Sequence, residues 1–359
     1  MVGPTTFGIV GSGWRSEFFA RLAGLLPEQL SLVGFAVRRS EAAAAATQRW
    51  QVPAYLSTAE LVRHQRPDFV ITSLPRDTNP SVVCDLVADK IPVLTETPPA
   101  ADLPGLSDLW SRVGSRRLVQ VAEQYLLMPG HAARHEIVRR GVIGTPTSVQ
   151  VSSTHDYHAV SMIRGLLGVD FDPVTVTATR LPAPLVDPLS RDGWTGDDTE
   201  HQADTTLAIL DFDGRSGLYD FTDNQWHNQL RLRRIVIRGS RGEIADDQVV
   251  HLTGPETIIK SSLTRSQLGY DLNLDGYDTE HLTFEGDVVY RNPFQGLRLM
   301  DEEIAIATML LAMGAWVRDE GPEPYPLDQG CQDHQISLAM HEAAATGTPV
   351  RTTPGPWVA

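Results

Sequence analysis

The sequence predicts an α/β protein in two parts: an N-terminal doubly wound parallel sheet, and a C-terminal α+β domain with a large, mostly antiparallel open sheet. Up to about residue 124, short and nearly continuous apolar runs alternate with helical patterns, as is typical of parallel strands covered on both faces. From about residue 145 the runs alternate apolar and polar residues, with turns between them, as is typical of antiparallel strands. A length of 359 residues also favours two domains over one core.

The first domain is predicted to span residues 1–124 and to contain five strands and five helices. Their order follows from apolar runs that end in glycine, proline or polar residues, each followed by residues at helical spacing. Ser40 is a plausible N-cap for an alanine-rich helix. The expected strands are Thr5–Val10, Leu30–Val37, 69–75, Pro92–Thr95 and Leu118–Ala122, and the expected helices are 17–26, one that begins at Ser40, Thr58–His64, Asn79–Asp89 and Leu103–Val113.

The second domain is predicted to span residues 125–359, with a C-terminal segment that is free to pack back on the first domain. Two long helices are expected near its end, at Asp301–Val317 and at about 332–345. The stretch Pro182–Gln202 is rich in Pro, Gly and Asp and is therefore predicted to be a long loop, either a functional lid or a disordered segment. The strand candidates are 147–153, 173–181, 204–212, 216–222, 231–239, 242–252 and 281–286.

Composition and charge exclude several classes of protein. A net charge of −15 disfavours nucleic acid or an anionic membrane as the main partner, because phosphate contacts need a basic surface. No stretch approaches the roughly 20 apolar residues of a membrane span, and the N-terminal segment lacks the pattern of a secretory signal. Cys84 and Cys331 are too few for a disulfide framework. These features favour a cytoplasmic enzyme that acts on a small molecule.

A glycine-rich loop joins the first strand to the first helix. It reads Gly11-Ser12-Gly13-Trp14-Arg15, and Ser16 stands where the third glycine of G-x-G-x-x-G would be. Glycines at this place allow a tight turn and let backbone N–H groups approach a pyrophosphate at the start of the helix. The motif alone is weak, and a structural turn would also explain it. Its position at the first strand–helix junction indicates a dinucleotide-binding (Rossmann) domain.

The end of the second strand bears on the choice of dinucleotide. An NAD site usually has Asp or Glu there, to accept a hydrogen bond from the ribose 2′-hydroxyl. Here the strand is followed by Arg38, Arg39 and Ser40. Two guanidinium groups suit a 2′-phosphate, so NADP(H) is slightly favoured over NAD(H). The alternative is that both arginines are ordinary solvated side chains.

The stretch VLTETPPA, residues 93–100, carries a more specific signal. Together with the glycine loop, the segment SLPRDTNP and a later histidine before a helix, it resembles the glucose–fructose oxidoreductase/inositol dehydrogenase/rhizopine catabolism (Gfo/Idh/MocA) family. In that family the fourth strand typically ends in Glu-Lys-Pro, and the lysine reaches the reacting hydroxyl. Glu96 and Pro98 match this motif, whereas Thr97 replaces the lysine. The resemblance implies further cofactor contacts from Ser73, Leu74, Pro75, Asn79, Glu96, Thr97, Pro98 and Glu123.

The second landmark of the family is a motif close to H-x-x-D-x-x-R-x-L-x-G. His158, Arg164 and Gly168 match it, whereas Ser161 replaces the aspartate. By resemblance, His158 exchanges a proton with the substrate hydroxyl, a role that suits a group with a pKa near neutrality. The resemblance also implies that Thr97 and Tyr157 assist catalysis. It implies a substrate-binding role for Tyr125 and His158, and the neighbouring His155 and Asp156 are expected to bind substrate or to tune His158.

Simpler interpretations of these residues remain open. His158 could be a capping or core histidine. A metal in the HDYH segment has no obvious third ligand, and His131 and His135 fit a solvated helix face better than a metal site, so no metal is predicted. Trp194 and Trp226 could line a sugar site, but tryptophan is more often a core residue.

The resemblance predicts an NAD(P)-dependent oxidoreductase that transfers hydride between a nicotinamide and a hydroxyl or carbonyl of a sugar- or cyclitol-like substrate. Because Thr97 removes the lysine's charge, two alternatives stay open: a redox-neutral glycosidase or lyase that retains its cofactor, and a non-catalytic nucleotide-binding protein. The family also implies a homo-oligomer, either a dimer or a tetramer, built by pairing the open sheet faces.

Overall fold

The computed structural model describes residues 3–358, and its contacts divide the chain into two compact units. The first unit comprises the chain up to Leu127, Leu299–Cys331 and the segment from Gly355. The second unit comprises Met128–Arg298 and Gln332–Pro354. The division therefore falls inside helix α9 (Leu327–Thr346), and two separate segments of the C-terminal third belong to the first unit.

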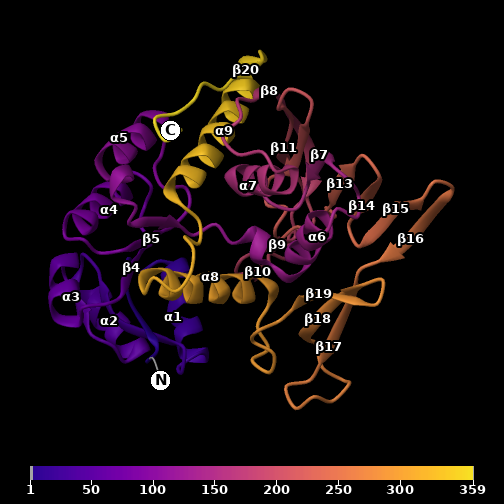
Figure 1. Ribbon diagram of the computed structural model, residues 1–359. Coiled ribbons are helices and arrows are strands. Elements are labelled where there is room, and N and C mark those ends of the chain that lie inside the picture. Colours follow the sequence, from indigo (N-terminus) through magenta and orange to yellow (C-terminus); the bar gives the residue numbers. More distant parts are fainter. Residues whose placement is uncertain (1–2, 359) are drawn as a thin grey trace. The chain divides into compact units, whose positions relative to one another are not determined.

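The first unit contains a six-stranded sheet of order β3-β2-β1-β4-β5-β6, in which every neighbouring pair is parallel. Figure 1 labels β4 and β5 of this sheet and the helices α1 to α5. The strand order reverses between β1 and β4, as in the doubly wound fold. This confirms the predicted fold class. The sixth strand, β3, has only two residues and was not predicted. The strands are β1 (Thr5–Val10), β2 (Leu30–Ala36), β3 (Ala54–Tyr55), β4 (Phe69–Thr72), β5 (Val93–Thr95) and β6 (Val119–Val121).

Helices alternate with these strands, and several begin at recognisable caps. Ser57 accepts a hydrogen bond from the amide of Glu60 at 3.2 Å, and Asp102 accepts one from Gly105 at 2.8 Å. The first helix begins at Trp14, inside the glycine motif and three residues earlier than predicted. The helices are α1 (Trp14–Leu25), α2 (Ser40–Trp50), α3 (Thr58–Gln65), α4 (Asn79–Ala88), α5 (Leu103–Val113) and the late α8 (Asp301–Val317), with short 3-10 turns at Gly114–Arg116 and at η2 (Tyr125–Leu127).

Helix α8 lies against strand β1 with little room between them. A Cβ atom on Gly314 would meet Oγ1 of Thr5 at 2.2 Å, so a larger residue there would push the helix off the strand. Thr5 is the first residue of β1, whereas Glu302 lies 12 residues before Gly314 and therefore about 18 Å along the helix. The beginning of α8 is thus placed near the carboxyl end of β1, where the glycine loop begins.

The second unit is built on a nine-stranded sheet of order β16-β15-β14-β13-β7-β12-β11-β8-β20, in which the pair β7–β12 is parallel and the other pairs are antiparallel. This confirms the predicted mostly antiparallel sheet. A three-stranded sheet, β17-β18-β19, belongs to the same unit. The strands are β7 (Pro146–Val151), β8 (Thr175–Val186), β9 (Leu189–Ser190), β10 (Gly193–Trp194), β11 (Glu200–Asp211), β12 (Ser216–Thr222), β13 (Ile235–Gly239), β14 (Gly242–Ala245), β15 (Gln248–Gly254), β16 (Thr257–Ser262), β17 (Thr264–Leu268), β18 (Asp278–Phe284), β19 (Asp287–Arg291) and β20 (Val350–Arg351).

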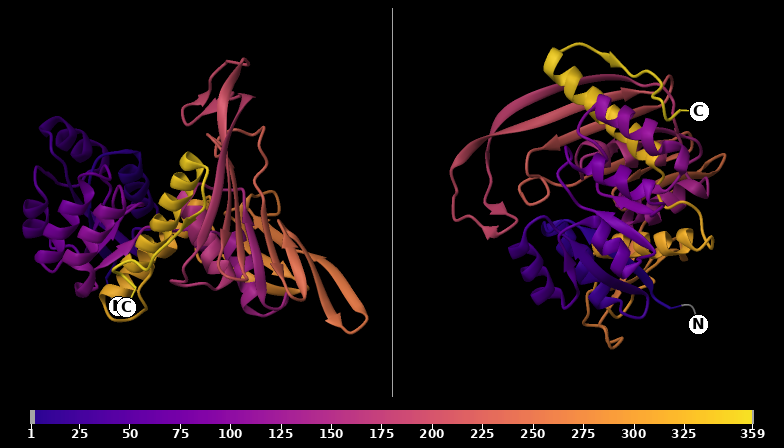
Figure 2. Two further views of the ribbon diagram at one scale, coloured as in Figure 1. Left: turned by 90° about the horizontal axis from the view of Figure 1, so that it is seen from above. Right: turned by 90° about the vertical axis from the view of Figure 1, so that its left-hand side faces the viewer.

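The prediction of a loop at Pro182–Gln202 was wrong. Strands β8 and β11 continue through most of this stretch as a long antiparallel ribbon, with the hairpin β9–β10 between them (Figure 2). Strand β20 pairs with β8 only at Thr175 and Val176, so the stretch of β8 that contains Pro182 and Pro184 is an edge of the sheet. Proline is tolerated at such an edge because no strand there needs its missing N–H group. Prolines at an edge position look like loop residues in a sequence.

Helices α6 (Pro129–Arg139) and α7 (Asp156–Leu167) and most of α9 complete the second unit. The inner face of the sheet carries Val149, Val151, Ala208, Leu210 and Tyr219, all of which are buried. Among the described helices, none is long and apolar enough to cross a membrane.

Candidate cofactor and catalytic site

The glycine loop leaves strand β1 in a conformation that only glycine adopts without strain. Gly11 has φ of +126°, and its amide donates to the carbonyl of Ala36 at 3.0 Å. A Cβ atom on Gly11 would lie 2.2 Å from the carbonyl oxygen of Ser73, in the loop that follows β4. The amide of Ser73 in turn donates to the carbonyl of Val10 at 2.9 Å. The loops after β1 and β4 therefore lie against each other at the point where the strand order reverses.

The start of α1 fits a pyrophosphate. Gly13 is the N-cap and offers no side-chain acceptor, and the amide of Glu17 is bonded to the carbonyl of Gly13 at 3.2 Å. A Cβ atom on Gly13 would meet nothing within 4 Å, so the backbone there can be approached closely from outside. Ser12 and Trp14 are exposed beside it. Such a helix start, with its positive dipole end open, is a ready site for a phosphate anion.

The guanidinium of Arg15 is paired with two carboxylates. Its Nε atom donates to Glu96 at 2.9 Å, and its Nη1 atom donates to Glu302 at 2.7 Å. Burial alone would lower the pKa of Arg15, but the two carboxylates raise it, so the guanidinium stays charged. The side chain of Gln124 donates to Glu302 at 3.1 Å. Arg15 thus connects the start of α1 to the end of β5 and to the start of α8. Gln124, which follows β6, joins the same group through Glu302.

Asn79, which was expected near the cofactor, is buried and organises the end of β5. Its side-chain nitrogen donates to Oγ1 of Thr95 at 2.7 Å and to the carbonyl of Pro99 at 3.4 Å. Oγ1 of Thr72 donates to the same Thr95 oxygen at 3.1 Å. The Glu96-Thr97-Pro98 segment follows directly, with a cis Thr97–Pro98 peptide bond and a half-buried Thr97.

Buried polar atoms without a partner gather at this edge of the first sheet. Within residues 3–358, no hydrogen-bond partner is found for Oγ of Ser16, Oδ1 of Asn79 or Oε1 of Gln124. Such groups call for a water molecule or a ligand. Together with the open backbone at Gly13, they show that the residues present fit a dinucleotide.

The other residues expected to contact a cofactor also stand at the carboxyl ends of the strands. Ser73 and Leu74 are half-buried and Pro75 is exposed, directly after β4. Glu123 follows β6, and its Oε1 atom accepts from the amide of Tyr125 at 3.2 Å. Arg38 and Arg39 follow β2 and are exposed, and neither forms an ion pair with a carboxylate of the described chain.

His158 lies in the first turn of α7, in the second unit, and only 7% of it is exposed. Its ring contacts those of Tyr157 and His155 edge-on, with centroids at 4.5 and 5.1 Å. Ser161, at the position of the family's aspartate, donates its hydroxyl to the backbone carbonyl of His158 at 2.9 Å. Ser161 therefore supports the helix backbone.

His155 and Tyr157 extend this contact into an aromatic cluster. Trp226 meets the ring of His155 edge-on at 4.5 Å and that of Phe221 at 4.7 Å. Tyr157 meets the ring of His334, on α9, at 5.8 Å. The structure thus brings together four of the residues that the sequence placed near a substrate, His155, Tyr157, His158 and Trp226, and adds His334 to them. Trp194, the other candidate, is exposed on β10.

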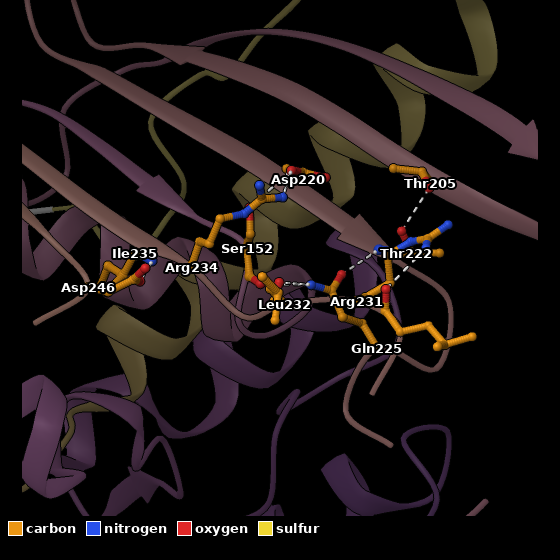
Figure 3. Close-up of polar contacts among 11 residues, drawn as sticks. Ser152, Thr205, Asp220, Thr222, Gln225, Arg231, Leu232, Arg234, Ile235 and Asp246 are labelled. Atoms are coloured by element: carbon orange, nitrogen blue, oxygen red, sulfur yellow. Dashed lines mark hydrogen bonds and ion pairs between the residues drawn. The ribbon is translucent and has the colours of Figure 1, made fainter. Parts of the chain in front are cut away.

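The loop that carries Trp226 is fixed by buried polar contacts (Figure 3). Oε1 of Gln225 accepts from the amide of Thr222 at 2.9 Å, and its nitrogen donates to the carbonyls of Ser152 and Leu232 at 2.9 and 3.1 Å. Oγ of Ser152 donates to Asp220 at 3.1 Å. The loop between β12 and β13 is therefore bound to the end of β7, just before His155, and holds Trp226 in place.

Asp156, the first residue of α7, has φ of +44° and forms an ion pair with His341 of α9 at 3.1 Å. Its backbone amide donates to the hydroxyl of Tyr219 at 3.3 Å. Burial alone would raise the pKa of Asp156, but the hydrogen bond and charge of His341, with contributions from His155 and His158, lower it. A charged Asp156 thus stands in the turn that carries His158.

Arg164, the second match to the family motif, connects the same helix to α9. It forms a buried ion pair with Asp333, and both side chains are 3% exposed. Its Nη2 and Nε atoms donate to the carbonyl of Asp170 at 2.6 and 3.1 Å. Arg164 therefore orients α7 and takes no part in the aromatic cluster.

A metal site finds no support in the described part of the chain, where no group of three or more His, Cys, Asp or Glu side chains is arranged to hold an ion. His131 and His135 lie on α6. Burial lowers the pKa of His135.

Sequence reasoning missed Glu302, Asp333, His334 and His341. Glu302 stands in the acidic run Asp301-Glu302-Glu303, which looks like an ordinary helix start. Its partner Arg15 lies 287 positions away. Asp333, His334 and His341 all lie on the expected final helix, but neither composition nor spacing shows which of them turns towards α7.

The glycine loop, the strand order and the orphaned polar atoms define the first unit as the nucleotide-binding domain of an NAD(P)-dependent oxidoreductase. Residues 5–123 match the GFO_IDH_MocA model, described as an oxidoreductase family with an NAD-binding Rossmann fold. This match covers the N-terminal third of the chain. No curated protein matches the chain in sequence.

Solved structures share the fold of the whole chain. A myo-inositol dehydrogenase from Corynebacterium glutamicum is 18% identical with a TM-score of 0.67, covering 98% of this chain and 99% of that one. An oxidoreductase from Agrobacterium radiobacter, in complex with NAD+, L-tartaric acid and magnesium, is 16% identical with a TM-score of 0.69 (96% and 98% covered). The WlbA dehydrogenase from Bordetella pertussis, in complex with NADH and UDP-GlcNAcA, is 15% identical with a TM-score of 0.65 (98% and 99% covered). At such identities the likeness shows the fold alone.

Proposed function

We propose that the protein transfers hydride between a nicotinamide cofactor and a hydroxyl or carbonyl group of a sugar- or cyclitol-like small molecule. The observation that carries this proposal is the glycine loop: Gly11 packed on Ser73, and an open backbone at Gly13, at the reversal point of a parallel sheet. Members of the same family fold include a myo-inositol dehydrogenase and an enzyme bound to a nucleotide sugar, which supports a polyhydroxylated substrate.

In this proposal His158 is the acid/base. Alcohol oxidation releases a proton as well as a hydride, and a bound nicotinamide accepts the hydride. An imidazole can take the proton near neutral pH. The ring contacts with Tyr157 and His155 hold His158 in one orientation, and the charged Asp156 stands in the same turn.

Thr97 and Tyr157 are proposed to assist by donating hydrogen bonds from their hydroxyls, in place of the family's lysine. A hydroxyl stabilises a developing alkoxide less than an ammonium does, because it carries no net charge. Tyr125, His155 and Asp156 are proposed to bind the substrate. Holding a polyhydroxylated molecule requires several donors and acceptors, which these side chains provide.

The cofactor is proposed to be NADP(H) in preference to NAD(H). Arg38 and Arg39 are exposed at the end of β2, where the adenosine ribose of a dinucleotide lies in this fold, and no carboxylate of the described residues neutralises them. Replacing both arginines by alanine should weaken NADP(H) binding at least tenfold and leave NAD(H) binding nearly unchanged, as calorimetric titration would show. Equal losses of affinity for NADP(H) and NAD(H) would show that these arginines do not determine which of the two nucleotides is bound.

A second function is favoured by the Thr97 substitution. A redox-neutral glycosidase or lyase-type enzyme oxidises a hydroxyl of its substrate, eliminates the leaving group, adds water across the double bond and reduces the carbonyl again with a retained nicotinamide. The cofactor therefore shows no net change. Mass spectrometry of nucleotide released from the purified protein distinguishes the two. Stoichiometric retained cofactor and bond cleavage without net reduction indicate the redox-neutral enzyme, whereas net formation of reduced cofactor from sugars or cyclitols indicates the dehydrogenase. A non-catalytic nucleotide-binding protein would give neither.

The open face of the second unit's sheet supports a homo-oligomer, a dimer or tetramer. Leu181, Leu207 and Ile209 share one face of strands β8 and β11 and are 48%, 37% and 53% exposed. Apolar residues that gather on an open sheet face are typical of an interface between copies. Light scattering after size exclusion checks this proposal, and a monomer at micromolar concentration would refute it. A cytoplasmic location is proposed as well, because Cys84 and Cys331 are buried and not joined in a disulfide.

A further inference from the structure

We infer that the charges around Thr97 make this protein bind the oxidised nicotinamide more tightly than the reduced form, with Thr97 and Glu302 as the determinants. The inference rests on the proposed function, because it concerns the same cofactor. It goes beyond that function by assigning a preference between redox states to particular side chains.

The first step is the location of the nicotinamide within the first unit. A dinucleotide lies across the reversal point of a doubly wound sheet, with its adenosine ribose at the end of the second strand. Here the reversal falls between β1 and β4, and β2 lies on the β1 side. The nicotinamide half is therefore assigned to the carboxyl ends of β4, β5 and β6. Glu96 and Thr97 follow β5 directly, and Glu123 follows β6.

The second step is the charge at these strand ends. One guanidinium, that of Arg15, faces two carboxylates, Glu96 at 2.9 Å and Glu302 at 2.7 Å. The formal charge of this group is therefore −1, and its members are mostly shielded from water, with 10%, 15% and 30% of their side chains exposed.

The neighbouring charges do not cancel this excess. Arg76 and Asp77, in the loop after β4, are exposed and of opposite sign. Glu303 is paired with Arg21 of α1. A lysine at position 97 would offset the excess, but Thr97 has no charge.

The third step is the difference between the two cofactor forms. Both carry the same phosphates, so the ratio of their dissociation constants cancels the phosphate contacts. The oxidised ring carries one positive charge and the reduced ring carries none. A net negative, partly water-excluded environment therefore stabilises the oxidised form selectively, whereas an ammonium at position 97 would repel it.

The test measures dissociation constants of the full-length protein for the oxidised and reduced forms of the same nucleotide, by calorimetric or fluorescence titration. The variants are Thr97→Lys, which adds a charge, and Thr97→Met, which adds similar length without charge. Glu302→Gln removes a carboxylate but keeps an acceptor for Arg15. Asp89→Asn removes an exposed carboxylate at the end of α4 and serves as the matched control.

The wild-type protein should bind the oxidised form more tightly. Thr97→Lys should shift the ratio towards the reduced form at least tenfold, and Glu302→Gln should shift it the same way by about threefold, because one formal charge is added or removed near the ring. Thr97→Met and Asp89→Asn should leave the ratio unchanged. Thermal unfolding with each nucleotide confirms that every variant is folded.

Three results would overturn the inference: tighter binding of the reduced form by the wild type, equal shifts for Thr97→Lys and Thr97→Met, or no binding of either form. The predicted ratios without turnover of any sugar or cyclitol would leave the inference standing and overturn the proposed function alone. Turnover of a sugar or cyclitol, together with an unchanged ratio of the two dissociation constants in Thr97→Lys, would overturn the inference and leave the proposed function standing.

Discussion

Gly11 and Gly13 stand two positions apart in one loop and yet meet different constraints. Gly11 needs its φ of +126° and its closeness to the carbonyl of Ser73, whereas a Cβ atom on Gly13 would enter open space. The sequence motif could predict both glycines but not this difference, because the partner of Gly11 lies in the loop after β4. Gly11 is therefore needed for the stability of the loop, whereas Gly13 leaves room for a ligand to approach the backbone.

Gly11→Ala should destabilise the first unit by about 2–4 kcal/mol, since it combines backbone strain with a steric clash. Gly24→Ala, in helix α1 with nothing within 4 Å of its added Cβ atom, should be neutral or stabilise by about 0.5–1 kcal/mol. Urea unfolding of both variants measures these changes. Equal stabilities of Gly11→Ala and the wild type would mean that the loop is not held against Ser73.

His158→Gln should lower kcat by about 10²–10⁴ and leave the dissociation constant of the cofactor within about twofold, because an acid/base acts on the substrate's proton. His64→Gln, on the exposed surface of α3, is the control and should retain activity. Steady-state kinetics with whichever sugar or cyclitol is turned over gives both values. Undiminished kcat in His158→Gln would assign this histidine to structure.

At the scale of elements, helix α7 is held at both ends by α9. Asp156 pairs with His341 near its start, and Arg164 pairs with Asp333 near its end. The family motif predicted Arg164, but its buried partner could not be read from the sequence because the two are 169 positions apart. These two pairs fix the direction in which His158 is presented.

Asp333→Asn should lower the free energy of unfolding of the second unit by about 3–5 kcal/mol, because it removes the buried carboxylate that faces Arg164 and leaves the exposed carboxylate of Asp170 at 3.8 Å. Asp213→Asn breaks the exposed pair with Arg351 and should cost at most about 1 kcal/mol. Urea unfolding monitored by tryptophan fluorescence compares the two. Similar small losses for both would show that the Arg164 pair is solvated.

The lowered pKa of Asp156 makes its contribution to stability depend on pH. A carboxyl whose pKa is lower in the folded state stabilises the protein above its unfolded pKa of about 3.9, and this contribution is lost as the pH falls through the folded pKa. Asp156→Asn should therefore lower the melting temperature near pH 6, and the gap should close as the pH falls below about 4. A difference in melting temperature between the wild type and Asp156→Asn that stays constant from pH 6 to below pH 4 would contradict the lowered pKa of Asp156.

At the scale of the whole molecule, the sequence predicted both domains' fold classes because strand type follows from apolar patterning. The sequence-based prediction failed where the position of a residue in the sheet, and not its local pattern, decides the structure. Pro182 and Pro184 lie in a strand because they occupy an edge, and β3 has only two residues, too few for any pattern. The candidate site divides in the same way: local motifs predicted the glycine loop and His158, whereas Glu302 and Asp333 act through partners distant in the chain.

The most direct test of the central claim is calorimetric titration of the full-length protein with NAD+ and with NADP+. The backbone geometry at Gly11 and Gly13 predicts one bound dinucleotide per chain with a micromolar or lower dissociation constant, and a loss of at least tenfold in Gly13→Val, whose side chain enters the open space from which the ligand approaches. Absence of binding by the folded wild-type protein for both nucleotides would contradict it.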